Sequence, residues 1–175
     1  HSPAGFIPEH AGGMIPLLHW GEKEKYLLGM MNSNTAMLFL SFLSPTLRFT
    51  EGPVGLVPIL YEKKYSSNVS YIVDVCESIS VLDWDSFETS WDFQRHPLLQ
   101  YAAFTPQMVA QEEANGYLTT NGIIDAYRNW EQACNERFNQ LKANEQELNR
   151  IFIDIYGLQD ELTPEVEDKD VTVRK

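Results

Sequence analysis

Apolar and aromatic residues at helical spacing run through residues 121–156, and this stripe constrains the fold more than any other feature. Its intervals are threes and fours, apart from one gap where Glu145 occupies the apolar position. The stripe consists of Tyr127, Trp130, Cys134, Phe138, Leu141, Leu148, Phe152 and Ile155. Near-heptad spacing predicts a long helix packed along a partner helix. At about 1.5 Å per residue it would span roughly 50 Å, so we expect part of the stripe to require a partner outside this chain.

Two shorter helical patterns precede the long one. Residues 22–43 predict a single helix that ends at Ser44-Pro45 and carries the apolar positions Leu27, Met30, Met31, Leu38 and Phe42. Residues 67–81 predict another, with a stripe of Val69, Ile72, Val73, Cys76 and Ile79. The long helix itself should end at Gly157, because glycine commonly terminates helices.

The N-terminal segment has a different pattern. Residues 4–20 resemble two short extended pieces around the turn Ala11-Gly12-Gly13, with Pro8 and Pro16 restricting them to sheet edges or strand ends. The predicted fold class is therefore α+β and mainly helical, with a small N-terminal β hairpin or sheet packed on helices and one long C-terminal helix. We expect residues 1–64 to form one region of short strands plus a helix, and residues 65–175 a helical region.

Charge is unevenly distributed. The net charge is −12, and residues 65–120 contain one basic and eight acidic residues, whereas residues 1–64 contain five of each. An acidic chain repels phosphate, so a stand-alone nucleic-acid binder is disfavoured, and only the first third could approach DNA without an electrostatic penalty. No apolar run reaches the roughly 18 residues of a membrane span. Cys76 and Cys134 are interpreted as buried free thiols of a cytoplasmic protein.

Sequence motifs for catalysis are missing. There is no dinucleotide-binding fingerprint, Walker motif, zinc pattern or nucleophile elbow. Residues 52–55, Gly-Pro-Val-Gly, are interpreted as a turn rather than a phosphate cradle, because no Lys-Ser or Lys-Thr follows. Asp83, Asp85, Glu112 and Glu113 are interpreted as solvated acidic surface, which disfavours an independent nuclease. The sequence therefore predicts no catalytic, cofactor-binding or metal-binding residue.

Three segments together resemble a known family. They are residues 26–59, YLLGMMNSNTAMLFLSFLSPTLRFTEGPVGLVPI; residues 83–99, DWDSFETSWDFQRHPLL; and residues 147–166, ELNRIFIDIYGLQDELTPEV. In this order, and over most of the chain, they are similar to the adenine-specific DNA methyltransferases of the BREX phage-defence system, the PglX-like proteins, and to related type II restriction–modification enzymes.

This resemblance implies a parent enzyme that transfers a methyl group from S-adenosylmethionine to adenine N6 in DNA, with restriction endonuclease activity as a further implication. The family's glycine-rich cofactor motif and its Asn-Pro-Pro-Tyr/Phe motif are both absent here. By resemblance, the chain is a non-catalytic fragment comprising target-recognition and helical regions. Its implied partners are double-stranded DNA, the parent's methyltransferase domain and other defence proteins, with no membrane.

Five residues are candidates for DNA contact. Asn32 and Asn34 could pair with adenine, although a helix–helix contact or a bend is the favoured interpretation. Arg48, Lys63 and Lys64 could contact phosphate, although solvated surface is the default interpretation.

The aromatic-rich residues 84–104 leave two interpretations, a base-stacking platform or a satellite core, of which the core is favoured because carboxylates surround them. Arg95 is expected to pair with Asp92 or Glu88. A competing function follows from this acidic region: a helical scaffold that docks partner proteins of a defence system without contacting DNA.

Overall fold

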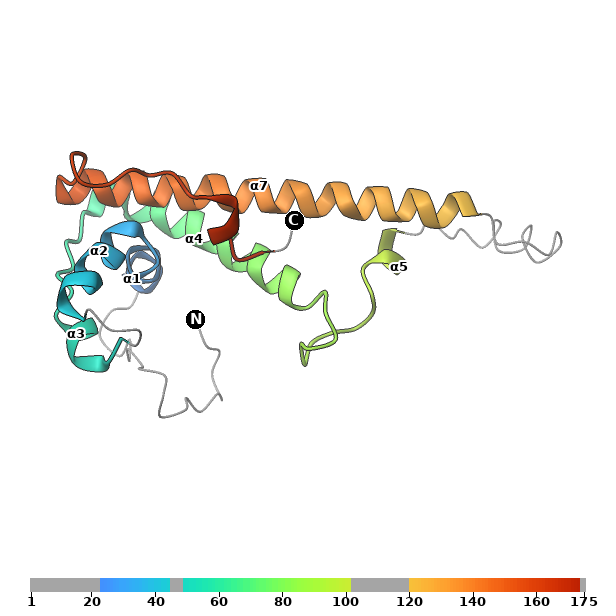
Figure 1. Ribbon diagram of the computed structural model, residues 1–175, viewed down its shortest axis with the longest axis horizontal. Coiled ribbons are helices and arrows are strands. Elements are labelled where there is room, and N and C mark those ends of the chain that lie inside the picture. The colour runs from blue at the N-terminus through green and yellow to red at the C-terminus, as the bar shows by residue number, and fades with distance from the viewer. Residues whose placement is uncertain (1–22, 45–48, 102–119, 174–175) are drawn as a thin grey trace. The chain divides into compact units, whose positions relative to one another are not determined.

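The described part of the chain is helical. The computed structural model describes residues 23–44, 49–101 and 120–173, with the side chains of 120–122 excepted. Its elements, shown in Figure 1, are α1 (Glu24–Met31), α2 (Asn34–Leu43), α3 (Glu51–Gly55), α4 (Lys63–Trp84), α5 (Leu98–Tyr101), α7 (Thr120–Tyr156) and the 3₁₀ turn η2 (Asp168–Asp170). None of the helices in these ranges is long and apolar enough to cross a membrane.

The α+β prediction is wrong, because the described residues contain no strand. Residues 4–20, where we expected the hairpin, lie outside the described residues. Farther along, residues 52–55, which we interpreted as a turn, belong to helix α3 instead. Pro53 is compatible with this helix because it lies in the first turn, where a backbone N–H would have no intrahelical acceptor.

The predicted single helix over residues 22–43 is divided into α1 and α2. Ser33 adopts an extended conformation between them and caps α2: its Oγ accepts from the Ala36 N–H at 3.4 Å and donates to the Met30 carbonyl at 2.7 Å. Asn32 caps the end of α1 through Nδ2, which donates to the Leu28 carbonyl at 2.9 Å. The two polar side chains replace backbone hydrogen bonds at the junction, which allows the chain to change direction.

The long helix is confirmed as α7, Thr120–Tyr156. Gly157 follows with φ +67°, the left-handed conformation that glycine adopts without strain. The Gly157 N–H donates to the Asp154 carbonyl at 3.3 Å and the Leu158 N–H to the Ile153 carbonyl at 3.0 Å. This pair of bonds is a Schellman motif, which satisfies the last carbonyls of the helix and fixes its end at the predicted residue.

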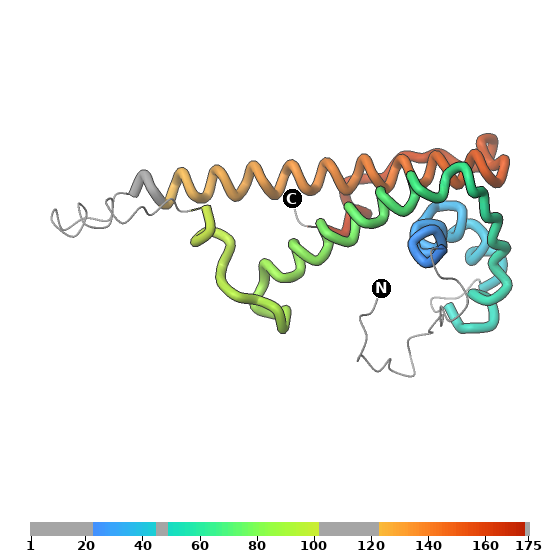
Figure 2. Tube along the Cα trace, turned by 180° about the vertical axis from the view of Figure 1, so that it is seen from behind, coloured from blue at the N-terminus to red at the C-terminus, as the bar shows by residue number. Residues whose placement is uncertain are grey.

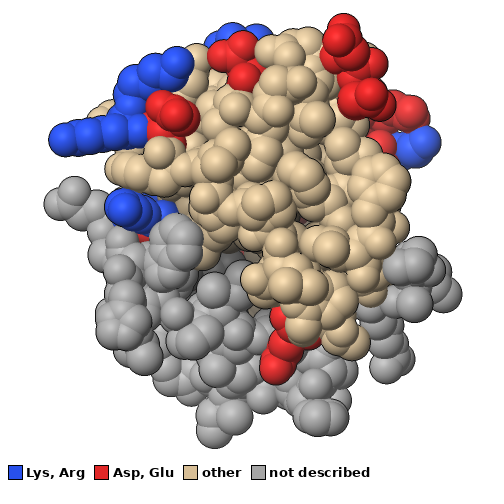
Figure 3. Space-filling view, turned by 90° about the vertical axis from the view of Figure 1, so that its left-hand side faces the viewer, with Lys and Arg blue, Asp and Glu red and all other residues tan. Residues whose placement is uncertain are grey.

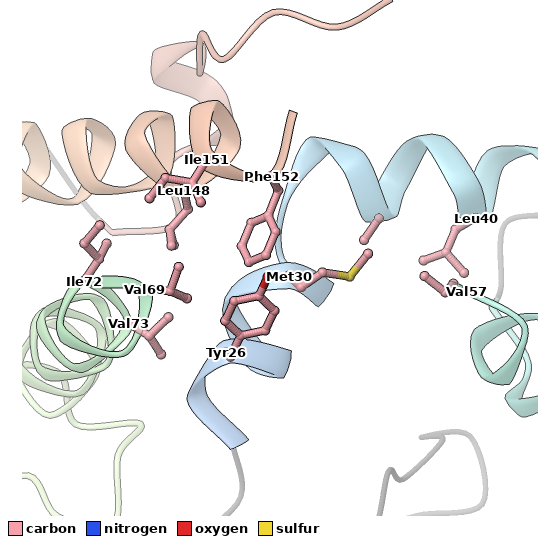
Figure 4. Packing of buried hydrophobic residues seen from close by; sticks show 11 residues of the cluster. Tyr26, Met30, Leu40, Val57, Val69, Ile72, Val73, Leu148, Ile151 and Phe152 are labelled. Atoms are coloured by element: carbon pink, nitrogen blue, oxygen red, sulfur yellow. The ribbon is translucent and has the colours of Figure 1, made fainter. Parts of the chain in front are cut away.

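The chain divides into two compact units. Unit one contains residues His1–Cys76 and Ala143–Val166, and unit two contains Glu77–Lys142 and Glu167–Lys175. Within unit one, the start of α4 lies beside the end of α7 in both Figure 1 and Figure 2. Its core joins α1, α2, α4 and α7, and Figure 4 shows the packed side chains. The buried cluster contains Tyr26, Met30, Ala36, Leu40, Val57, Val69, Ile72, Val73, Leu148, Ile151 and Phe152.

Both predicted stripes correspond to buried faces over most of their length. In unit one, Val69, Ile72 and Val73 of α4 are buried together with Leu148 and Phe152 of α7. The α7 residues Phe138 and Leu141 are buried in unit two, whereas Tyr127 is 51% exposed. Cys76 and Cys134 are free thiols, as predicted, but both are half-buried rather than buried.

Candidate functional site

The polar groups at the Asn32–Asn34 junction form hydrogen bonds within the fold. The Asn34 backbone N–H, at the first turn of α2, donates to Oδ1 of Asn149 at 2.8 Å. The Asn34 side chain donates from Nδ2 to the Thr163 carbonyl at 3.3 Å. Asn34 is half-buried by these contacts, whereas Asn32 remains exposed. The geometry therefore gives Asn34 a positioning role between α2 and the segment that follows α7.

Asn149 is a buried polar residue that the sequence reasoning missed. It is 4% exposed on α7, accepts from the Asn34 N–H, and donates from Nδ2 to the Pro164 carbonyl at 3.3 Å. It thus joins the N-terminus of α2, the long helix and the segment near Pro164. No local pattern could reveal it, because its partners lie 115 residues before it and 15 after it.

We expect Asn149→Ala to destabilise the chain by about 2–3 kcal/mol, because two partly buried backbone groups lose their partners. Urea unfolding followed by circular dichroism measures this as a lower midpoint. Asn139→Ala is the matched control: Asn139 is exposed on the same helix, so its replacement should change the midpoint little. Equal shifts for the two variants would contradict the bridging role.

A basic group surrounds the start of α4. Lys63 and Lys64 are both exposed in its first turn, which contains no acidic residue. The sequence reasoning missed a third member, Lys23, whose Nζ lies 4.4 Å from the centre of the Tyr61 ring. We call Lys23, Lys63 and Lys64 the α4 basic group. Arg48, the remaining predicted cation, lies outside the described residues.

Two tyrosine hydroxyls fix the connector that leads into α4. The Tyr26 hydroxyl donates to the Leu60 carbonyl at 2.9 Å and accepts from the Glu62 N–H at 3.3 Å. The Tyr156 hydroxyl donates to the Pro58 carbonyl at 2.6 Å and accepts from the Leu60 N–H at 2.9 Å. Burial raises the pKa of both tyrosines above the ordinary value of 10.0, at which the hydroxyl is already a protonated donor at neutral pH. These bonds attach the connector before Lys63 and Lys64 to α1 and α7.

The α4 basic group is suited to anion binding rather than to covalent chemistry. Exposed ammonium groups beside the positive end of a helix attract phosphate without distinguishing bases. Within the described ranges, no three His, Cys, Asp or Glu side chains converge as a metal site would require. The chemistry available at this surface is electrostatic positioning of an anionic ligand.

Glu145 occupies the apolar gap of the α7 stripe and is half-buried. Burial raises the pKa of its carboxyl group from 4.5 to about 7. The folded state therefore retains this proton at pH values where the unfolded chain has released it. Stability contributed by the protonated form is lost as the pH rises from about 4.5 to about 7.

We expect Glu145→Gln to stabilise the chain at pH 8 relative to the unchanged protein, with little difference near pH 4.5. After allowance for solvent screening, the gain should be about 1–2 kcal/mol. Unfolding midpoints measured at both pH values test this. Glu131→Gln, at an exposed position of the same helix, should show no such pH-dependent gain. A gain for Glu145→Gln that is the same at both pH values would contradict the burial argument.

The aromatic region of unit two is partly exposed. Phe87 and Phe93 are half-buried, but Trp84 is 59% exposed and Trp91 is 97% exposed. The loop around Trp91 is held by Ser90, whose Oγ donates to Asp85 Oδ1 at 2.6 Å and accepts from the Asp92 N–H at 3.1 Å. The expected satellite core thus includes only part of this segment.

Arg95 does not form the ion pair predicted for it. The side chain is exposed, and within the described residues it makes no salt bridge with Asp92 or Glu88. In the neighbouring loop, hydrogen bonds come instead from Ser90.

Comparison with known proteins identifies two relatives, although no protein-family model matches. The chain is 41% identical, over all 175 residues, to the adenine-specific methyltransferase PglX of Lacticaseibacillus casei (strain Zhang), and covers 13% of that protein. It is 26% identical over 164 residues to the adenine-specific methyltransferase BrxX of Escherichia coli O9:H4 (strain HS), covering 12% of it. The match confirms the resemblance carried by the three sequence segments. The chain spans only a small part of the length of either relative.

Proposed function

Because the chain resembles, along its whole length, a segment of the PglX-like adenine-specific methyltransferases, we propose that it is a non-catalytic helical part of such an enzyme. In this proposal the parent transfers a methyl group from S-adenosylmethionine to adenine N6, and this segment positions the DNA. The catalytic domain and the cofactor site belong to other parts of the parent. The full-length similarity to PglX is the observation that carries the proposal.

The α4 basic group is the part of the segment that we propose contacts DNA. Lys63 and Lys64 are exposed at the first turn of α4, and Lys23 lies against Tyr61 in the connector before it. Lysines placed this way neutralise phosphates and hold the duplex without reading its sequence. In this proposal Asn34 does not contact DNA, because its side chain and backbone N–H form hydrogen bonds within the fold. Asn32 is exposed and remains a candidate for DNA contact.

We expect Lys63→Ala combined with Lys64→Ala, in the full-length enzyme, to weaken DNA binding and flatten its salt dependence. Each lost phosphate contact should lower the slope of log affinity against log salt by about 1. Fluorescence anisotropy with a labelled duplex over a range of salt concentrations measures the slope. Lys169→Ala is the control, because Lys169 is exposed in unit two and pairs with Glu167. An unchanged slope in the double variant would contradict phosphate contact by α4.

A second candidate, protein scaffolding, is supported by Trp91. A tryptophan that is 97% exposed in a hydrogen-bonded loop is a suitable anchor for a partner's pocket, and Glu88 and Asp92 beside it disfavour nucleic acid. Scaffolding predicts that partner binding depends on Trp91 and is indifferent to Lys63 and Lys64. The salt-slope experiment above therefore separates the two functions.

A further inference from the structure

Helix α2 is apolar on the side that faces away from the core as well as on the side that faces it. Ala36 and Leu40 belong to the buried cluster of unit one. Met37 is 51% exposed, Phe42 76% and Leu43 38% on the same ten-residue helix. Helices with apolar residues on all sides are typically buried on all sides.

Exposed apolar residues also flank the neighbouring helix α3. Phe49, just before α3, is 41% exposed, and Leu56, just after it, is 69% exposed. The α2–α3 face consists of Met37, Phe42, Leu43, Phe49 and Leu56. Helix α2 contains no charged residue, and α3 contains only Glu51. Figure 3, which views the side where α2 and α3 lie, shows a largely uncharged surface with charged side chains near its margins.

The character of this face identifies the kind of partner that fits it. DNA would require cations, and the described residues of α2 and α3 include none. Loosely associating partners generally meet surfaces with more polar groups, whereas uncharged apolar faces are typical of permanent contacts. Contiguous apolar patches are also uncommon on free monomers, because they promote aggregation.

We propose that the α2–α3 face docks against another part of the same polypeptide, the methyltransferase part of the parent enzyme. This inference rests on the proposed function. The segment covers 13% and 12% of its two relatives, so most of such a polypeptide lies outside these 175 residues and could supply the part that covers the α2–α3 face. Covalent connection supplies a high effective concentration, and a hydrophobic interface between domains of one chain limits their relative motion. The contact would hold the α4 basic group, on the same unit, at a fixed position relative to the catalytic part.

Amide hydrogen exchange tests this docking directly. Exchange of residues 37–43 and 49–56 is compared between the 175-residue chain alone and the full-length enzyme. We expect at least ten-fold slower exchange in the full-length enzyme, and loss of that protection when Phe42→Ser and Leu56→Ser are combined. Tyr71→Ser is the matched control, since Tyr71 is 69% exposed on α4 outside the face and its replacement should leave the protection intact.

Two results would overturn the proposal. Equal exchange in the isolated chain and the full-length enzyme would show that nothing in the polypeptide covers the face. A dimer of the isolated chain in analytical ultracentrifugation, lost with Phe42→Ser and Leu56→Ser, would assign the face to a second copy. The exchange experiment contains no DNA, so it tests only the docking of the α2–α3 face. Failure of the DNA-positioning proposal would instead appear as an unchanged salt slope in the DNA-binding experiment.

Discussion

Phe152→Ala is expected to destabilise the chain by about 3–5 kcal/mol, because a large buried side chain is removed. Phe152 is fully buried in unit one, and its ring makes an edge-to-face contact with Tyr26 at a centroid distance of 5.3 Å. Its removal leaves a cavity between α1, α4 and α7, where Figure 4 shows Val69 and Ile151 nearby. Domains of this size have a free energy of unfolding of about 5–15 kcal/mol, so the substitution would remove a large part of it.

Urea unfolding followed by far-ultraviolet circular dichroism measures the loss. Phe42→Ala is the matched control, because Phe42 is 76% exposed and its truncation leaves no cavity in the isolated chain. We expect the Phe42 variant to unfold within about 0.5 kcal/mol of the unchanged chain. If Phe152→Ala were equally mild, the cluster around it could not be the core that holds α1 and α4 on α7.

Gly29→Leu is expected to cost about 3 kcal/mol, because α1 and α4 approach too closely for a side chain at this position. A Cβ atom at Gly29 would lie 3.0 Å from Val73 Cγ2, 3.2 Å from Val69 Cγ1 and 3.5 Å from Leu148 Cδ2. A leucine would therefore force these helices apart. Gly55→Leu supplies the comparison, since nothing lies within 4 Å of a Cβ there, and it should change stability little.

Rescue distinguishes crowding from other effects of the Gly29 substitution. Val73→Ala removes the side-chain atom nearest to the added Cβ. In a double-mutant cycle we expect Val73→Ala to cost less in the Gly29→Leu background than in the unchanged chain, with a coupling of about 1 kcal/mol. Strict additivity of the two changes would contradict close packing at this crossing.

The long elements of the fold could be predicted from the sequence because their signals are local and repeated. The α4 and α7 stripes recur over many turns, and Gly157 marks the end of α7 with a single residue that tolerates positive φ. The break at Ser33 was missed because the residues around it also fit one apolar helical pattern. Ser33 caps a new helix because its side chain bonds to nearby backbone groups in competition with the hydrogen bonds of a continuous helix. The spacing of apolar residues gives no information about that competition.

The candidate site was predictable where it depends on local charge. Lys63 and Lys64 were identified as a basic pair, and both are exposed at the start of α4. Lys23 and Asn149 were missed, because their importance comes from contacts with distant residues. Asn34 was a candidate for DNA contact from its residue type, although a helix contact or bend was the favoured interpretation; its observed partners are the Asn149 side chain and the Thr163 carbonyl.

The central claim is that this segment positions DNA without taking part in the chemistry, and steady-state methyl-transfer kinetics test it most directly. The full-length enzyme and its Lys63→Ala, Lys64→Ala double variant are compared with a duplex substrate at saturating S-adenosylmethionine. The account predicts a several-fold higher KM for DNA with kcat unchanged, because phosphate contacts contribute uniform binding. A fall in kcat with KM unchanged, or no change in either constant, would contradict it.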